Sequence, residues 1–112
     1  MLTILVKNYL TPEGFDYFRK EWYPKLLSIA QQQKGFVSLT YKVHPDVYDC
    51  IHLTLKFKDD KSLAAWVELP SHDEIINELD GYRSRKYWEA ASTEDENIDP
   101  SNLEWETIKV SS

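Results

Sequence analysis

The 112-residue chain has little of several features that would define a class of protein. It contains a single cysteine, Cys50, so an intrachain disulfide is excluded, and no residues near it have the spacing of a zinc site. Its longest apolar stretches, such as Leu2 to Val6, are far shorter than the roughly 20 residues that cross a bilayer. The N-terminus lacks a basic segment followed by an apolar signal core. We therefore expect a cytoplasmic protein that does not associate with membranes.

Glycine and, in one stretch, basic residues are also scarce. The three glycines of the chain do not form a phosphate loop, a Walker pattern or a nucleophile elbow. From Glu89 to Glu106 there are seven acidic residues and no lysine or arginine. The rest of the chain has 12 acidic and 13 basic residues and is close to neutral, so no basic stripe is left for nucleic acid. We interpret residues 89–102, approximately, as a solvated acidic loop, and a docking tail for a basic partner is the alternative.

The chain is long enough for one domain over residues 1–112, since about 100 to 150 residues is the usual domain size. Period-two alternation from Leu2 to Tyr9 predicts a first strand, with Asn8 on the same face as Ile4 and Val6. Residues 35–44 and 47–58 are rich in β-branched and aromatic side chains and flank a turn at His44-Pro45-Asp46, which predicts an antiparallel hairpin. Residues 103–110 are predicted to form the last strand.

Helix signals lie between these strands. Thr11 is a predicted N-cap and Pro12 a first helical residue, and an apolar stripe continues until Gly35. Pro24, inside this stretch, predicts a kink.

Two further helices are predicted between the hairpin and the acidic loop. Asp59 or Asp60 caps a short helix that ends near Leu69. Ser71 and Glu74 then form a capping-box pattern that opens the next helix.

The order strand, helix, strand, strand, helix pair, strand predicts an α+β ferredoxin-like sandwich. Such a fold has an antiparallel four-stranded sheet with helices on one face. The other face would carry apolar side chains such as Leu5 and Tyr9, which a small monomer rarely leaves in water. We therefore expect a homodimer that forms through this sheet face.

Several segments together resemble the antibiotic biosynthesis monooxygenase family of the dimeric α+β barrel group. They are a first strand ending in Asn8, Gly35-Phe36-Val37-Ser38, Ser62-Leu63-Ala64-Ala65-Trp66 and Pro70-Ser71-His72. The likeness covers roughly residues 1 to 90, and the final strand fits by position. The family includes cofactor-independent oxygenases of quinone or polyketide substrates, heme-degrading enzymes and proteins with no known activity, so fold by itself is a weak guide to function.

Resemblance to the heme-degrading branch of this family implies three residues. They are an asparagine at the end of the first strand, a tryptophan on the middle helix and a histidine about ten residues after that tryptophan. Asn8 and Trp66 match this pattern. The histidine position falls at Ile76 or Asn77, neither of which supplies an imidazole, and His72 lies about one helical turn too early. We therefore expect no cofactor and keep a heme-binding monooxygenase as an alternative.

Each candidate residue has a structural and a functional interpretation. The Asn8 amide caps a turn or binds a substrate oxygen. Trp66 is a core residue or an aromatic wall for a flat ligand. His72 is an exposed helix-start residue, or a neutral base favoured by the positive end of its helix.

Other polar residues have simpler interpretations. His52 is predicted on the sheet face that meets the partner, and His44 in the turn, with no companion at metal-ligand spacing. Arg83, Arg85 and Lys86 cluster at a helix end, where they complement the helix dipole, and an anion site is the alternative.

The leading hypothesis is a homodimer with one small hydrophobic pocket per subunit, between helices and sheet. The resemblance implies cofactor-independent oxygenation of an aromatic, quinol or polyketide-like small molecule. In this scheme His72 is the base, Asn8 stabilises the oxyanion and Trp66 helps to enclose the substrate. Further substrate contacts are assigned to Phe18, Trp22, Tyr41 and Tyr82. A non-catalytic ligand-binding dimer, whose pocket is filled by its own aromatic side chains, is the remaining alternative.

Overall fold

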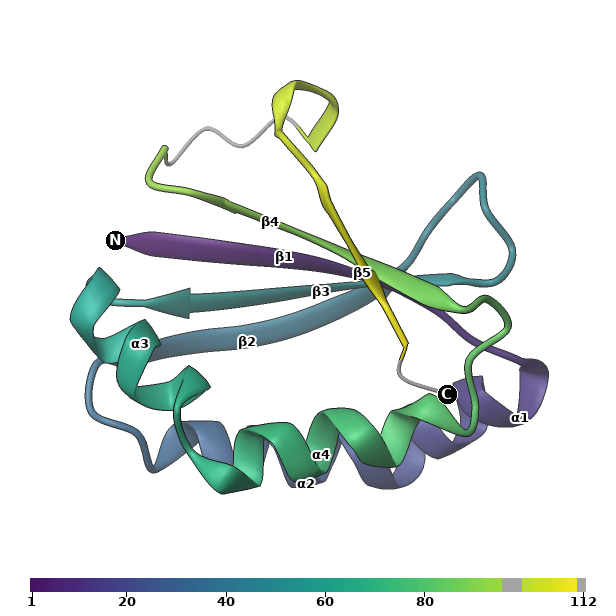
Figure 1. Ribbon diagram of the computed structural model, residues 1–112, viewed down its shortest axis with the longest axis horizontal. Helices are drawn as coiled ribbons and strands as arrows, with labels where there is room; N and C mark the ends of the chain where they lie inside the picture. The colour runs from purple at the N-terminus through teal and green to yellow at the C-terminus, as the bar shows by residue number, and fades with distance from the viewer. Residues whose placement is uncertain (96–99, 111–112) are drawn as a thin grey trace.

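A computed structural model describes residues 1–95 and 100–110 and shows one antiparallel sheet with its α-helices on one side (Figure 1). The spatial order of the strands is β2-β3-β1-β4-β5. The strands are β1 (Leu2–Tyr9), β2 (Phe36–Val43), β3 (Cys50–Phe57), β4 (Tyr87–Thr93) and β5 (Glu106–Lys109). The helices are α1 (Pro12–Tyr17), η1 (Phe18–Trp22), α2 (Tyr23–Gln31), α3 (Asp60–Val67), α4 (Pro70–Asp80) and the short η2 (Pro100–Asn102).

The predicted α+β ferredoxin-like architecture is confirmed, but the sheet has five strands and not four. The additional strand is β4, which pairs with β1 in the register Val6 to Ala90 and occupies the start of the predicted acidic loop. Its two alanines and its glutamate gave a weak strand signal, and pairing with β1 overrides that local preference. The last strand is also shorter than the predicted range 103–110. Residues 96–99 of the predicted loop lie outside the described residues.

The first helical stretch begins as predicted and contains one irregular turn. The Thr11 hydroxyl accepts a hydrogen bond from the Gly14 N–H at 3.1 Å, and Pro12 occupies the first turn. Residues 18–22 form a π-helix in which the N–H of Tyr23 reaches the carbonyl of Phe18. Pro24 has no N–H, so it cannot supply the usual helical hydrogen bond here. Where the sequence predicted a kink, the structure has this π turn.

The starts of the next two helices were predicted with mixed success. Asp59 caps α3, since its carboxylate accepts a hydrogen bond from the Ser62 N–H at 2.8 Å. The predicted capping box at Ser71 is wrong, because α4 begins one residue earlier at Pro70, with Leu69 at the N-cap and no side-chain cap. Proline suits the first helical position because its φ is fixed and it has no N–H to satisfy.

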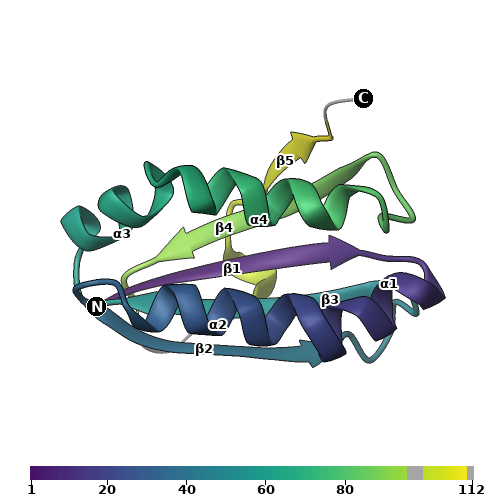
Figure 2. The ribbon, with the colours of Figure 1, turned by 90° about the horizontal axis from the view of Figure 1, so that it is seen from below.

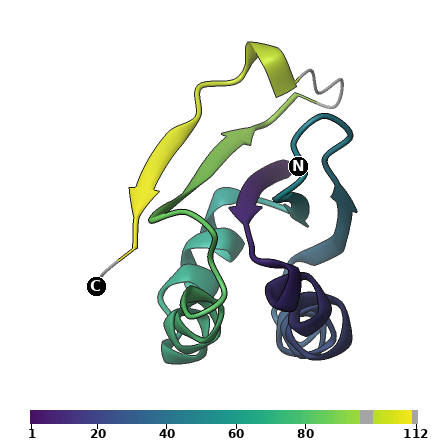
Figure 3. The same ribbon diagram turned by 90° about the vertical axis from the view of Figure 1, so that its right-hand side faces the viewer.

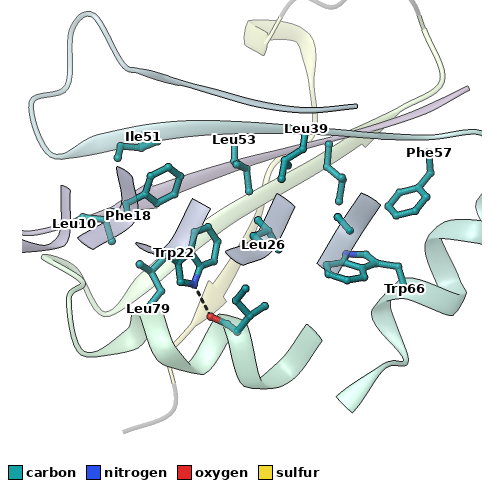
Figure 4. Close-up of a cluster of buried hydrophobic side chains, with 13 residues drawn as sticks. Leu10, Phe18, Trp22, Leu26, Leu39, Ile51, Leu53, Phe57, Trp66 and Leu79 are labelled. Atoms are coloured by element: carbon teal, nitrogen blue, oxygen red, sulfur yellow. Dashed lines mark hydrogen bonds between the residues drawn. The ribbon is translucent and has the colours of Figure 1, made fainter. Parts of the chain in front are cut away.

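A hydrophobic cluster fills the space between the helices and the sheet (Figure 4). The opposite, outer face of the sheet is partly covered by the same chain, since η2 and the segment leading into β5 lie on that side (Figures 1 and 3). There the Lys7 Nζ lies 4.1 Å from the centre of the Trp105 ring, and Leu5 and Tyr9 are buried. The face that we expected to require a partner is thus already partly buried, and the homodimer stays a prediction.

Gly35 between α2 and β2 gives a direct test of this connection. Its φ is +85°, and a Cβ at this position would overlap the Ser62 hydroxyl and lie 2.5 Å from the Ser62 Cβ. We expect Gly35→Ala to lower the free energy of unfolding by about 1–3 kcal/mol, measured by urea denaturation.

Gly81→Ala is the matched control for this substitution. Gly81 has φ −68°, and an added Cβ would meet nothing within 4 Å. We therefore expect this variant to be neutral or stabilised by up to about 1 kcal/mol. Equal urea midpoints for the two variants would contradict the left-handed conformation of Gly35.

Candidate functional site

Asn8 is a buried amide near the end of β1, on the helix side of the sheet. Only 2% of its surface is exposed. It shares this face with Ile4 and Val6, as the sequence alternation predicted. Its Oδ1 accepts a hydrogen bond from Arg83 Nη1 at 2.9 Å. A buried amide needs such a partner, because an unpaired one would carry a desolvation cost of about 1–3 kcal/mol.

Arg83 follows α4 and is held by the turn that brings α4 back to β1. An isolated antiparallel bridge joins Arg83 to Leu10, and Arg83 Nε donates to the Asp80 carboxylate at 2.7 Å. The Arg83 side chain is only 3% exposed, and that of Asp80 is 24% exposed. Burial lowers the pKa of Arg83, and the hydrogen bond and charge of Asp80 act in the opposite direction. We call Asn8, Asp80, Arg83 and Trp88 the Asn8 cluster, since the Arg83 guanidinium also lies 5.7 Å from the centre of the Trp88 ring.

On the helix side of β1, the centre of the strand next to this cluster is incompletely covered. Ile4 and Val6 are half-buried, whereas Thr3 and Leu5 on the outer side are buried. Ala90 of β4, which pairs with Val6, is also half-buried. Seen from the helix side, α4 and α2 run on either side of β1 (Figure 2). The Asn8 cluster therefore adjoins an apolar strip that retains contact with solvent.

His72 lies at the other end of α4 from the Asn8 cluster. Its ring is perpendicular to that of Trp66, with 5.3 Å between ring centres, and its Nδ1 is 3.4 Å from the Asp73 carboxylate. The rise of α4 from His72 to Asp80 is about 12 Å. Within one chain the two predicted catalytic groups, Asn8 and His72, therefore do not face a common point.

The predicted aromatic walls pack against one another in the core (Figure 4). Phe18, Trp22 and Trp66 are buried. Trp22 donates its indole N–H to the Ile75 carbonyl at 2.6 Å and stacks on Phe18 with ring centres 5.1 Å apart. Tyr41 meets Phe18 edge-on at 5.0 Å. These contacts agree with the core interpretation of these side chains, and their role as substrate contacts stays a prediction.

Two surface pockets lie away from the predicted catalytic residues. One, of about 360 Å³, contains the predicted substrate residue Tyr82, which stacks on Tyr17 with 4.4 Å between ring centres. The other, of about 460 Å³, lies between the end of α2 and the start of α3. Neither pocket is lined by Asn8, Trp66 or His72.

The part of the chain that the structure describes contains neither a candidate metal site nor a membrane-spanning helix. Within residues 1–95 and 100–110, no group of three or more histidine, cysteine, aspartate or glutamate side chains is placed to hold a metal ion. No helix in these ranges is long and apolar enough to cross a membrane.

The geometry described above can be compared with known proteins. No protein-family model and no curated protein matches the chain. Solved structures do match. A conserved protein from Methanosarcina mazei Go1 has 16% sequence identity and a TM-score of 0.72, with 82% of this chain and 89% of that chain covered.

Two further structures carry the name of an activity. SnoaB from Streptomyces nogalater, a cofactor-independent oxygenase, has 14% identity and a TM-score of 0.70, with 88% of this chain and 96% of that chain covered. An antibiotic biosynthesis monooxygenase has 11% identity and a TM-score of 0.67, with 88% of this chain and all of that chain covered. The chain has the antibiotic biosynthesis monooxygenase fold. At these identities the likeness concerns the fold alone.

Within this antibiotic biosynthesis monooxygenase fold, Asn8 lies on the predicted face of β1, but its partner Arg83 was not predicted. Arg83 was grouped with Arg85 and Lys86 as a helix-end cation, and Trp88 was given no role. The Asp80 and Arg83 spacing of three residues was the available local signal, because such pairs meet across a helical turn. Contact with Asn8 had no such signal, since 75 residues separate the two.

Proposed function

We propose that this chain is a cofactor-independent monooxygenase that acts on a flat aromatic, quinol or polyketide-like small molecule. The observation that supports this best is the buried Asn8 amide beside a half-buried apolar strip, with Arg83 bound to its oxygen. The description of SnoaB as a cofactor-independent oxygenase is a second support, from fold likeness.

The chemistry that fits this arrangement begins with loss of a proton from a carbon next to a phenol or ketone. The resulting enolate places negative charge on its oxygen, where an amide N–H of Asn8 stabilises it. Molecular oxygen adds to the carbanion carbon, the resulting peroxide anion takes back the proton that the base had removed, and the hydroperoxide then loses water to give a ketone. One CH₂ group and one O₂ give one C=O group and one water, so no other reductant is required.

We further propose a base and a dimer interface for this function. His72 acts as the base only for a substrate that extends along α4, because about 12 Å of helix separates it from Asp80 in the Asn8 cluster. The homodimer would form through the part of the outer sheet face that Trp105 and its neighbours leave uncovered. Ligand binding without turnover is a second candidate, favoured by the close packing of Phe18 against Trp22.

Oxygen uptake with dithranol, a flat tricyclic carbon acid, tests the proposed function. We expect Asn8→Ala to lower kcat by about 10²–10³-fold, because removal of one oxyanion donor has this effect in other enzymes. Asn77→Ala is the matched control, since Asn77 is an exposed amide on α4, and it should retain wild-type turnover.

Three results would decide against oxygenation. Wild-type rates in Asn8→Ala would reject the role of Asn8. Binding of dithranol to the wild-type protein without faster oxygen uptake than in buffer would favour the non-catalytic candidate. The absence of both binding and turnover would reject this substrate class.

A further inference from the structure

We propose that Arg83 is a positioning residue for Asn8, which fixes the side-chain amide with its N–H groups directed toward the substrate oxygen. This inference rests on the proposed function and adds a residue that the sequence analysis had assigned to the helix dipole. It also narrows the substrate to molecules that carry an anionic oxygen, such as an enolate or phenolate, in their reacting form.

The direction of the Asn8 amide follows from the chemistry of its partner. A guanidinium group has only donors, so the amide must turn its Oδ1 toward Arg83 Nη1, 2.9 Å away. The Nδ2 group then points elsewhere. Within residues 1–95 and 100–110, Nδ2 has no hydrogen-bond partner, and it is not completely shielded from solvent. The described residues thus leave the two N–H donors of Asn8 without a partner.

Arg83 is itself fixed in place, as a positioning group must be. Its Nε is bound to Asp80 at 2.7 Å, its backbone is bridged to Leu10, and its guanidinium lies near the Trp88 ring. A side chain that is 3% exposed, bound to Asp80 and packed near Trp88, on a bridged backbone, has little freedom to turn. The orientation of Asn8 is therefore set before a substrate arrives.

The charge of Arg83 also affects the donor strength of Asn8. A charge-assisted hydrogen bond to Oδ1 polarises the amide, and bonded groups strengthen one another in a buried site. The Nδ2 hydrogens consequently favour an anionic oxygen over a neutral carbonyl. The positive charge of Arg83 therefore acts on the substrate through the polarised Asn8 amide, without a direct contact between Arg83 and the substrate.

A double-mutant cycle on dithranol oxidation tests this arrangement. We expect Arg83→Met to lower kcat by about 10–100-fold with KM changed by less than about threefold, since the interaction is strongest in the transition state. Because Arg83 acts through Asn8, the combined variant Asn8→Ala with Arg83→Met should be no slower than Asn8→Ala. Independent, multiplied losses would overturn the proposal.

Arg85→Met is the matched control. Arg85 is bound to Asp49 at 3.0 Å and lies over the Tyr9 ring on the outer face, so it stabilises the fold without contact to Asn8. It should lower the thermal midpoint and leave kcat of the folded protein unchanged. If Arg83→Met does not fold, Asp80→Asn replaces it, because it removes the carboxylate that holds Arg83. Asp80→Asn should also lower kcat, by a smaller factor than Arg83→Met. An unchanged kcat in Asp80→Asn would overturn the proposal.

A measurement without turnover separates this inference from the proposed function. The Asn8 side-chain NH₂ signals in a ¹⁵N–¹H NMR spectrum are identified by their loss in Asn8→Ala. In Arg83→Met, or in Asp80→Asn, they should shift and exchange faster with solvent, while Arg85→Met leaves them in place. Unchanged signals would overturn the positioning role. Shifted signals in a protein without oxygen uptake would support the positioning role and reject the oxygenase function.

Discussion

Trp22→Ala should lower the free energy of unfolding by about 4 kcal/mol, a large part of the 5–15 kcal/mol available to a domain. Trp22 is buried on η1 and stacks on Phe18. Its indole N–H also joins this helix to α4 through the Ile75 carbonyl. The substitution therefore removes a large buried side chain, leaves a cavity and breaks a contact between two helices.

Urea denaturation measures this effect, and two other variants divide it into parts. Trp22→Phe retains most of the packing and loses the hydrogen bond, so we expect a loss of about 1–1.5 kcal/mol. Tyr48→Ala removes an aromatic side chain that is 91% exposed and should change stability by less than about 0.5 kcal/mol. If Trp22→Ala unfolds at the wild-type midpoint, the side chain is not a structural part of the core.

The result also bears on function. Trp22 was predicted to contact substrate, but its neighbours in the structure are core side chains. A core residue changes stability, whereas an aromatic wall changes substrate affinity with little effect on stability. Dithranol binding by Trp22→Phe therefore separates the two interpretations, and the core interpretation predicts wild-type affinity.

Stability should fall by about 3 kcal/mol between pH 7.5 and pH 4 because of one buried histidine, His52. The His52 side chain is 7% exposed, and its Nε2 has no hydrogen-bond partner in the described parts of the chain. The groups that face it are the His44 ring, the Trp105 ring, Lys7 from β1 and Lys42 from β2. Burial, followed by the positive charge of His44, Lys7 and Lys42, lowers the pKa of His52 from 6.5 to about 4.

The sign of the effect follows from proton uptake. Between pH 6.5 and pH 4 the unfolded chain protonates this histidine and the folded chain does not, so acidification favours unfolding in this window. His52→Phe retains a ring that cannot be protonated, and its stability should lose this pH dependence. His72→Phe is the control, because it removes a histidine from the helix side and leaves His52 and its cationic neighbours in place. An equal pH dependence in His52→Phe and in the wild-type protein would contradict the assignment.

Asp49 acts in a lower pH range and does not obscure this test. Burial by itself would raise the pKa of its carboxyl group, but hydrogen bonds from Arg85 and Ser84 outweigh burial and hold the pKa below its ordinary value. The stability that this carboxylate contributes is therefore present above about pH 4 and is lost on further acidification.

Local features of the structure could be predicted from the sequence because they depend on neighbouring residues. Alternation placed Asn8 on the helix side of β1, and the Thr11 and Asp59 side chains cap the helices that were assigned to them. Weak local signals were misleading. Ala90 and Ala91 concealed β4, and Pro70 begins α4 one residue before the capping pattern at Ser71.

The α+β class, the order of most elements and the position of the Asn8 amide could be derived from the sequence, because alternation and capping act over a few residues. The surroundings of that amide depend on tertiary contacts. The tertiary structure brings Arg83 to Asn8, separates His72 from both along α4, and places Trp105 over the outer face. These contacts join residues far apart in the chain, and they depend on strand pairing and packing that no local pattern encodes.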